Sequence, residues 1–276
     1  MAQTGSVQYA LWSPDGWTTV YSVGKVVGGQ RGLDANVSTR RSIGGQGTIV
    51  GGVMVPRLIF SYLPETAALL TYVKRAAYPA GPLPELSFEA GTGAEGVRLT
   101  AAKCNRCVVD LAVGEALRVE MDWWSPARPV PTAGGWMAPI GAPTFEWYGG
   151  AVTVDGASYA AQRAKITLEN NLMAVATLDT KPAGHRRYPD EILEGYEEVA
   201  AVVDFLADPG YDLGGDELPR ADVRLQATNG TETVTILLEN AVPERWRQGF
   251  EIDGLIAWRV EYRLPPNSGL FSITVT

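Results

Sequence analysis

Few residues in this chain of 276 residues have the types and spacing that catalysis or metal binding requires. Cys104 and Cys107 form a C-x-x-C pair, which is half of a zinc site or of a redox motif. A structural zinc ion needs four ligands, but the sequence has no second cysteine pair and only one histidine, His185. A thioredoxin-like pair would begin a helix, whereas this pair lies between predicted strands. We therefore expect two unmodified thiols.

His185 and the acidic residues that follow it are the other candidates. His185 lies in the polar stretch 184–187, and a catalytic triad would need an aspartate and a serine beside it in space. The carboxylates after it could hold a cation or form a glycosidase pair, but hydrolysis needs two of them in a cleft. Five carboxylates in one loop are more typical of a solvated face: Asp190, Glu191, Glu194, Glu197 and Glu198. The pattern predicts no enzyme, no cofactor and no metal ion.

Eight tryptophans leave two interpretations open. Exposed indole faces would suit a carbohydrate-binding β-sandwich module, which is the alternative function. Packing in the core and at subunit interfaces is the interpretation that we favour, because aromatic residues are enriched there. Five of the tryptophans lie at strand positions near the ends of the predicted domains: Trp12, Trp17, Trp123, Trp124 and Trp147.

Composition limits the classes of partner. The formal net charge is −8, which argues against tight binding of nucleic acid, because that affinity comes mostly from Lys and Arg on phosphates. With 46% hydrophobic and 20% charged residues, the chain is globular rather than disordered. The first residues lack the basic and apolar regions of a signal peptide, and no apolar run is long enough to span a membrane. We expect a cytoplasmic chain with reduced cysteines and no membrane partner.

Alternating hydrophobicity and frequent turn signals predict a mainly β protein. The longest predicted strand is Lys165 to Leu178, and Ser42 to Gly52 is a glycine-rich loop or hairpin tip. One helix is expected over Pro64 to Tyr78, because proline suits the first turn and Lys74-Arg75 suit the last. Glu197 to Leu206 has the composition of a strand or of a helix.

The two halves of the chain have matching segments in the same order. Arg118 to Met121 matches Arg259 to Tyr262 at an offset of 141 (259 − 118), and Val97 to Thr100 matches Val234 to Leu237 at an offset of 137 (234 − 97). Leu33 to Arg41 corresponds in order to Lys165 to Asn170. The order favours a strand for Glu197 to Leu206, because this segment corresponds in the repeat to the predicted strand Val53 to Leu63. A duplicated domain follows: residues 1–126 and 144–276, joined by a linker rich in proline and glycine at 127–143.

The order of these elements resembles that of the tail tube proteins of long-tailed bacteriophages. The resemblance rests on the strand with the paired Asn170-Asn171, the charged loop with proline and glycine after it, the strand Glu197 to Leu206, and then a hairpin and a final strand pair. It covers both halves, most clearly Ala151 to Leu264. It implies two tandem β-sandwich tube domains with a flanking α-helix, whose strands join an oligomeric β-barrel around a lumen.

The resemblance also implies a function and a set of partners. Members of this family are structural virion proteins that form stacked rings, through which DNA is ejected. With two domains in one chain, a homotrimer would fill six positions and give approximate six-fold symmetry. The implied partners are further copies of the chain, the tape measure protein, the tail terminator, the distal tail proteins and double-stranded DNA that passes without tight binding. The chain would assemble in the host cytoplasm and end in the virion tail.

Two loops match by position the loop that reaches the next ring in this family, 41–52 and 179–195. Glycine permits unusual backbone angles in the first, and the mixed charge of the second suits salt bridges to a facing ring. The expected inter-ring residues are Arg41, Gly47, Lys181, His185, Arg186, Arg187, Asp190 and Glu191.

Strand alternation predicts which side chains line the lumen. In the strand from Lys165 the apolar set begins with Ile166 and Leu168, and the opposite set would face the DNA. Lys165 and Arg40 should be paired with acids or lie outside the bore, and we expect a net negative lumen, which would repel phosphates. The expected lumen-facing residues are Asp34, Asn36, Ser38, Thr167, Glu169 and Asn171.

Overall fold

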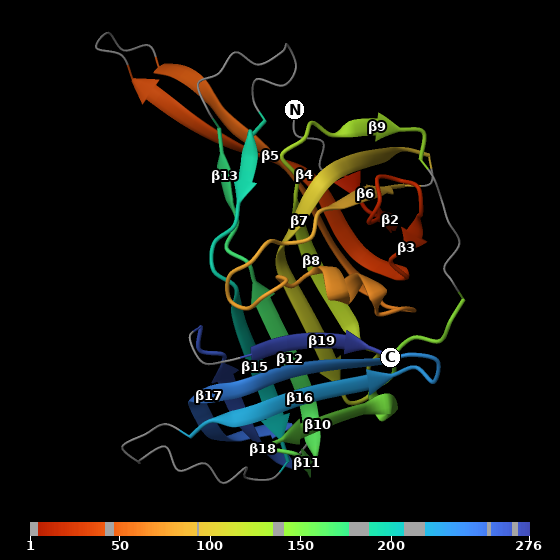
Figure 1. The fold of residues 1–276 in the computed structure, drawn as a ribbon, viewed down its shortest axis with the longest axis vertical. Helices are drawn as coiled ribbons and strands as arrows, with labels where there is room; N and C mark the ends of the chain where they lie inside the picture. Colours follow the sequence, from red (N-terminus) through yellow and green to blue (C-terminus); the bar gives the residue numbers. More distant parts are fainter. Residues whose placement is uncertain are drawn as a thin grey trace.

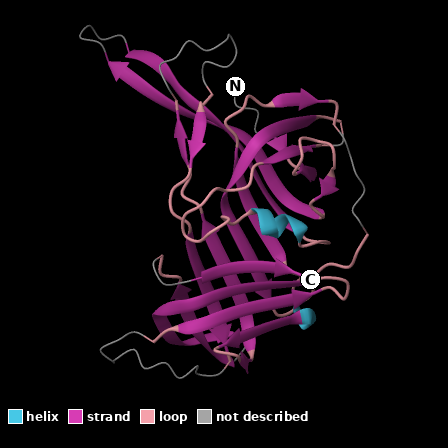
Figure 2. Ribbon diagram, viewed as in Figure 1, coloured by secondary structure: helices cyan, strands magenta, loops and turns pink. Residues whose placement is uncertain are grey.

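Antiparallel β-strands make up most of this protein, as the mainly β prediction requires (Figure 2). The computed structural model describes residues 5–41, 47–92, 94–134, 141–176, 188–206, 219–252, 255–266 and 270–276. For residues 5–6, 31–41, 47–53, 246–252 and 255–257 it describes the backbone alone. Seventeen strands form one connected sheet, and two more form a small separate sheet.

The strands divide between the two halves of the chain. Those of the first half are β1 (Gly5–Ser6), β2 (Tyr9–Ser13), β3 (Tyr21–Ser22), β4 (Lys25–Arg41), β5 (Gly47–Leu63), β6 (Leu86–Gly91), β7 (Gly96–Ala112), β8 (Arg118–Trp124) and β9 (Val130–Thr132). Those of the second half are β10 (Gly150–Val154), β11 (Ala157–Tyr159), β12 (Ala161–Glu169), β13 (Met173–Val175), β14 (Glu191–Leu193), β15 (Glu198–Phe205), β16 (Ala221–Thr228), β17 (Thr233–Ile252), β18 (Leu255–Arg263) and β19 (Leu270–Val275).

Nine strands lie side by side in the order β1-β4-β5-β8-β7-β12-β15-β18-β17, which we call the main sheet. β7 and β17 are shared, because their first parts leave the main sheet and pair with other strands. The first part of β7 pairs with β6 and β9, and that of β17 pairs with β16 and β19. In Figure 1 these second groups of strands cross in front of the main sheet.

The pattern of pairing occurs twice along the chain. In the first half, β5 lies between β4 and β8; in the second half, β15 lies in the same way between β12 and β18. The pair β2–β6 of the first half likewise corresponds to the pair β10–β16 of the second. The registers of the strand pairs also agree between the two halves. Phe60 faces Met121 and Ala201 faces Tyr262, and both members of the second pair come 141 residues later (201 − 60 and 262 − 121). The matching segments seen in the sequence therefore occupy matching positions, although Leu33 to Arg41 starts farther along its strand than Lys165 does.

The core lies on one side of the main sheet, between it and the crossing strands. Alternate residues of β15 show this: Val199, Ala201 and Val203 are buried, and Ala200 and Val202 are only partly buried. One cluster of buried side chains runs through both halves, and it includes Phe60 and Trp123 from the first and Phe205 and Tyr262 from the second. β7 of the first half pairs with β12 of the second, so the two halves share a sheet as well as a core.

The predicted helix over Pro64 to Tyr78 is wrong. This segment contains only a five-residue 3-10 helix, Ala68–Tyr72, and no α-helix occurs in the described ranges. Tertiary contacts satisfy its backbone instead: Ala67 N–H donates to Glu232 Oε2 at 2.9 Å, and Arg75 N–H donates to Glu197 Oε2 at 3.0 Å. Partners outside the segment thus replace the bonds that an α-helix would make.

Two strand predictions need different boundaries. The strand expected over Lys165 to Leu178 ends at Glu169, because Asn171 has a left-handed φ of +49° and breaks the ladder before β13. Residues 47–52, expected as loop, belong to β5. Residues 42–46 lie outside the described residues. Glu197 to Leu206 is confirmed as a strand, β15.

The segment expected to be a linker, 127–143, is only partly described. Its residues 130–132 form β9, which pairs with β7 of the first half. Residues 135–140 lie outside the described part of the chain. The division into two domains around this segment stays a prediction.

Adjacent valines of β15 test the orientation of the main sheet. Val203→Ala should lower the free energy of unfolding by about 2 kcal/mol, because it removes buried methyl groups and leaves a cavity. Val202→Ala is the matched control and should change it by less than about 0.5 kcal/mol, because this side chain lies on the opposite face. Urea unfolding followed by tryptophan fluorescence measures both. Equal losses from the two variants would contradict this orientation.

Candidate assembly surfaces

The side of the main sheet away from the core carries charged side chains in register, and we call it the charged face. One row across the strands contains Asp122, Arg106 and Glu169, and a second contains Arg163, Asp204 and Arg259. Cross-strand pairs of opposite charge stabilise a sheet, and they give each charged group a partner of opposite sign. Acids and bases therefore alternate along these rows.

Each arginine of these rows has a carboxylate partner. Arg106 lies 3.4 Å from Glu120 and 3.3 Å from Glu169. Arg259 makes a bidentate contact with Asp204, with distances of 2.7 and 2.9 Å. Arg163 makes the same kind of contact with Asp110, in which its Nε lies 2.8 Å from Oδ1. Because Asp110 and Asp204 accept hydrogen bonds from the guanidinium groups, the pKa of Arg163 and that of Arg259 are raised.

The expected lumen-facing residues are only partly on this surface. Thr167 and Glu169 lie on the charged face, and Glu169 is paired with Arg106. Asn171 lies beyond the end of β12, where its Nδ2 donates to the carbonyl of Tyr196 at 2.9 Å. Asp34, Asn36 and Ser38 belong to β4, but the description of their positions covers the backbone alone. Both signs of charge occur on the charged face, so its described part does not support a wall that is simply acidic.

A long hairpin extends from one end of the main sheet. β4 and β5 pair along their whole lengths, from Lys25 opposite Leu63 to Arg41 opposite Gly47. β8 covers β5 only over residues 57–62, so residues 33–41 and 47–55 form a two-stranded arm. In Figure 1 this arm reaches the same end of the molecule as β13 and β14. A two-stranded hairpin is marginally stable in water by itself, so such an arm favours contact with another chain.

The predicted inter-ring residues lie around this end where they are described. Arg41 and Gly47 face each other at the outer end of the arm, and Glu191 begins β14. Asp190 and Glu191 are both exposed. Lys181, His185, Arg186 and Arg187 lie outside the described residues, so their role stays a prediction.

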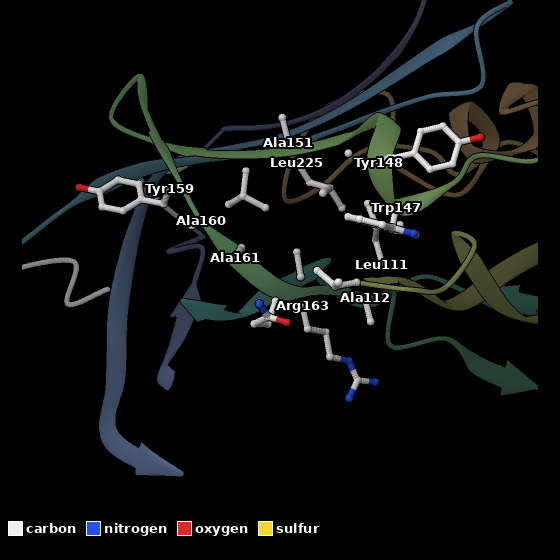
Figure 3. Close-up of a pocket in the computed structure, with 15 residues that line it drawn as sticks. Leu111, Ala112, Trp147, Tyr148, Ala151, Tyr159, Ala160, Ala161, Arg163 and Leu225 are labelled. Atoms are coloured by element: carbon white, nitrogen blue, oxygen red, sulfur yellow. The ribbon is translucent and has the colours of Figure 1, made fainter. Parts of the chain in front are cut away.

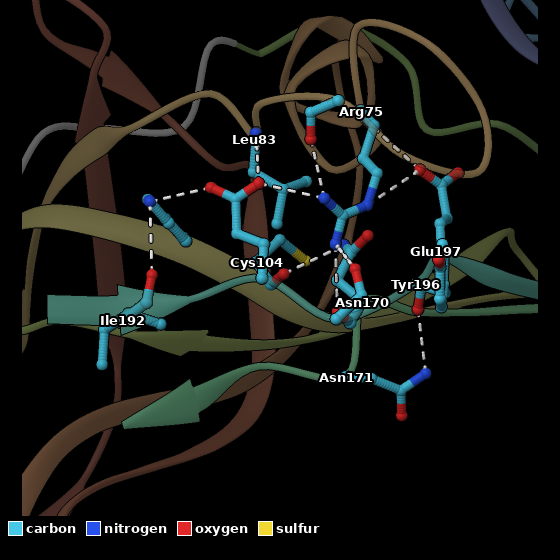
Figure 4. Close-up of polar contacts among 12 residues, drawn as sticks. Arg75, Leu83, Cys104, Asn170, Asn171, Ile192, Tyr196 and Glu197 are labelled. Carbon is cyan, nitrogen blue, oxygen red and sulfur yellow. Dashed lines mark hydrogen bonds and ion pairs between the residues drawn. The ribbon is translucent and has the colours of Figure 1, made fainter. Parts of the chain in front are cut away.

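A buried arginine holds the base of β13–β14 against the body of the protein (Figure 4). Arg75 is 3% exposed, and its guanidinium donates to the carbonyls of Gly81 at 2.7 Å and Asn170 at 3.2 Å, and also to that of Gly195. Its Nη1 lies 3.0 Å from Glu194 Oε2. One planar side chain thus joins the 3-10 segment, the end of β12 and the approach to β15.

Two more groups complete this Arg75 cluster. Lys103 of β7 lies 2.8 Å from the other oxygen of Glu194. Asn170 is fully buried, and its Nδ2 donates to the carbonyls of Val73 at 2.9 Å and Cys104 at 3.0 Å. Ion pairs and carbonyls therefore satisfy most of the polar atoms here. Arg75 Nε, Asn170 Oδ1 and Glu197 Oε1 are exceptions, because they are buried without a hydrogen bond.

The acidic run is not a solvated face throughout, as the sequence led us to expect. Glu197 is 1% exposed, and Glu194 forms ion pairs with Arg75 and Lys103. No specific signal in the sequence indicates this, because Arg75 follows Lys74 and the pair is equally typical of the end of an exposed helix. Among the described residues, no group of three or more His, Cys, Asp or Glu side chains could hold a metal ion.

Burial raises the pKa of Glu197, and its contacts with Arg75 oppose that shift only in part. Because the pKa of Glu197 is higher in the folded than in the unfolded chain, the folded chain binds a proton at this carboxylate first as the pH falls. The contribution of Glu197 to stability therefore falls as the pH rises through the interval between the two values.

The two cysteines face the core, so they are inert thiols rather than a redox pair. Asn105 is an extra residue where the register of β7 against β8 shifts, and this lets Cys104 and Cys107 both point inward, 0% and 2% exposed. Burial raises the pKa of Cys107 to about 12 and that of Cys104 well above its usual value. The reactive thiolate is therefore strongly disfavoured in both.

A cavity of ≈ 330 Å³ lies beside the start of β10, near the end opposite the arm (Figures 1 and 3). Trp147 and Tyr148 lie at one end of it and Tyr159 at the other. Trp147 is 42% and Tyr148 76% exposed, whereas Trp12 and Trp123 are 2% and 0% exposed. Packing is thus confirmed for the latter two tryptophans, and Trp147 keeps a surface available to a ligand or to another chain.

Comparison with known proteins gives no independent identification. A scan against protein-family models and a search of the curated proteins both returned no match. The helices of the described part of the chain include none long and apolar enough to cross a membrane.

The Arg75 cluster should stabilise the fold strongly. Arg75→Met should lower the free energy of unfolding by about 3 kcal/mol at neutral pH, because it leaves the carboxylates of Glu197 and Glu194 without the positive charge of Arg75. Near about pH 5 the loss should be smaller, because Glu197 can take up a proton. Urea unfolding at both pH values measures this difference.

Two further variants separate charge from geometry. Arg75→Lys should recover less than half of the loss, because an ammonium group cannot bond several carbonyls in one plane. Arg224→Met on the exposed side of β16 should change the stability by less than about 0.5 kcal/mol. A full recovery by lysine would contradict the role given to the planar guanidinium.

Proposed function

We propose that this protein is a structural protein of a bacteriophage tail, a tail tube protein with a duplicated tube domain. The observation that carries the proposal is the pairing pattern that occurs twice in one sheet, with β17 at one end and β4, covered only by the two residues of β1, at the other. A repeated unit that ends in strand edges is suited to continue into another copy of itself. The resemblance in element order points the same way.

The duplication favours rings of three chains. Each chain supplies two equivalent sets of strands, each a sandwich of main-sheet strands and crossing strands, so three chains give six sets. Closing the sheet into a barrel removes its edges, and the arrangement would have true three-fold and approximate six-fold symmetry. The β7–β12 pairing inside one chain would be the covalently linked version of the joint between chains.

The charged face suits the wall of a DNA conduit. Unpaired Lys or Arg side chains would hold phosphates and add friction, whereas arginines engaged by carboxylates offer less attraction. Arg106, Arg163 and Arg259 are all engaged in this way. This differs from a wall that repels DNA by net negative charge, because pairing rather than excess acid would limit the attraction.

The arm and the β13–β14 end suit contacts between stacked rings. At the outermost rings, the same surfaces would meet the tail terminator and the distal tail proteins. The tape measure protein would lie inside the tube. Among the described residues, the two strands of the arm pair only with each other. Val55 at the base of the arm belongs to the same buried cluster as Ile192 of β14. The loops around residues 42–46 and 177–187 would make the outermost contacts.

A carbohydrate-binding module is the second candidate. The observation that favours it is the cavity beside Trp147 and Tyr148, because exposed aromatic rings can stack on sugars. A monodisperse monomer that binds soluble glycans, and loses that binding in Trp147→Ala, would favour this alternative.

Electron microscopy and native mass spectrometry of the purified chain test the proposal. We expect rings of three chains, some of them stacked into tubes, because strand edges pair until the sheet closes. A ring of six chains would contradict the duplication, and a monomer at every concentration would contradict the function.

Replacement of residues 178–187 by a short Gly-Ser linker should leave rings but prevent tubes. The matched control is the same change in the turn 229–231, where Asn229 and Gly230 form a hairpin. Normal tubes from the first variant would count against the inter-ring role of this loop.

Affinity for DNA tests the paired charges. Assembled wild-type tubes should bind double-stranded DNA weakly. Asp110→Asn should strengthen binding, because it frees Arg163. The slope of log K against log salt should steepen by about 0.9 for each arginine that gains a phosphate. Glu95→Gln removes one exposed acid elsewhere and is the control for net charge. No difference between the two variants would contradict this role of the charged face.

A further inference from the structure

The main sheet ends in two edges whose backbone groups lack strand partners in the described part of the chain. At one end, β4 pairs with β5 on one side and has only the two residues of β1 on the other. At the other end, residues 242–252 of β17 pair with β18 alone. Such edges are templates for another strand.

The joint between the two halves shows how this sheet continues from one unit into the next. β7 pairs with β12 over seven residues, from Arg163 opposite Ala112 to Glu169 opposite Arg106. Hydrogen bonds from Val113 N–H to Gln162 O (2.9 Å) and from Asn170 N–H to Asn105 O (2.8 Å) extend the same register at its two ends. The last main-sheet strand of one unit thus pairs with the first strand of the next.

Because the registers repeat in the two halves, the pairing in this joint predicts which residues would face each other if β17 of one chain paired with β4 of another. Val109 of β7 and Trp246 of β17 face Val119 and Val260, which occupy matching positions in β8 and β18. In the same way, Gly29 of β4 faces Phe60, and Ile166 of β12 faces the matching Ala201. Because Val109 faces Ile166 in the internal joint, Trp246 should face Gly29 of a second copy.

We propose that residues 245–248 of one chain pair antiparallel with residues 27–30 of a second copy, in the register of the β7–β12 joint, and that residues 5–7 must first leave that edge. This proposal rests on the proposed function and names its joint. The register places Arg245 opposite Gln30, in the position of Val108 opposite Thr167. Gln30 and Arg245 are both exposed in the single chain.

Residues 5–7 act as a removable cap on this edge. Val7 N–H donates to the carbonyl of Gly29 at 3.2 Å, and Ser6 and Gly5 face Gln30 and Arg31. These are the backbone groups that the second copy needs. β1 offers two paired residues and the bond from Val7, whereas the proposed joint pairs four residues of each strand, so a second copy in register can replace the cap. The cap leaves the edge covered until a partner of the right register arrives.

Disulfide trapping tests the register. The Gln30–Arg245 pair corresponds to a pair without mutual hydrogen bonds, in which Cα atoms are about 4.5 Å apart, within the range of a disulfide. The full-length double variant Gln30→Cys with Arg245→Cys should convert under mild oxidation from monomer to covalent species that end at a trimer. Gln30→Cys with Glu244→Cys is the control, one residue out of register and also exposed. Cys104 and Cys107 are buried and should not react.

A second pair tests the cap. Ser6 faces Gln30 in the same kind of position, next to the hydrogen-bonded pair of Val7 and Gly29. Ser6→Cys with Gln30→Cys should therefore form an internal disulfide that locks the cap. The oxidised chain should remain a monomer, and reduction with dithiothreitol should restore the assembly of the wild type. Gln30→Cys alone controls for the substitution.

The outcomes separate this joint from the function on which it rests. If wild-type chains form rings but the in-register pair links no better than its control, the register is wrong and the function stands. If the locked chain assembles as well when oxidised as when reduced, residues 5–7 are no cap. If wild-type chains form no rings and no variant links, both proposals fall. Covalent trimers from the in-register pair, together with redox-controlled assembly of the locked chain, support the joint.

Discussion

Backbone hydrogen bonding at strand edges is the constraint on which the rest of this structure depends. Every strand needs a partner on each side or a reason to lack one. β7 and β17 meet this need by leaving the main sheet along their length, so each serves two groups of strands. The fold that results places the core between these groups, and in the described part of the chain the main-sheet ladder can continue at its two outermost edges.

The Arg75 cluster has a different role: it attaches the projecting strands β13 and β14 to the β core with little apolar contact. β13 and β14 pair over only three residues, and their apolar contact with the body is small, as in the cluster of Val55, Leu83, Leu172 and Ile192. Ion pairs and carbonyl contacts around Arg75 fix their base instead. The raised pKa of Glu197 shows the energetic cost, since burial of this carboxylate is not fully compensated. Apolar packing could give similar stability, but it would leave the direction of the projection less well defined.

The sequence predicted the features that depend on local pattern and order. Alternation identified most strands, and position in the repeat correctly assigned β15, whose composition alone was ambiguous. The helix prediction failed because proline, charge and an apolar stripe are local signals, whereas the backbone of this segment is bonded by Glu232 and Glu197 from far along the chain. Buried ion pairs were missed for the same reason. No local pattern distinguishes Glu197, which is buried, from Glu198, which is exposed.

Net charge was an incomplete guide to the charged face, because it ignores which charges are neighbours. Each arginine of the two rows lies within ion-pair distance of a carboxylate, and the rows run across strands of both halves. Within about 10 Å, the screening distance at moderate salt, a polyanion therefore meets both signs of charge at once. A surface of this kind attracts a phosphate less than isolated arginines would, and it repels a phosphate less than isolated acids would. Strand register, rather than composition, determines this property, because it is the register that brings Asp204 between Arg163 and Arg259.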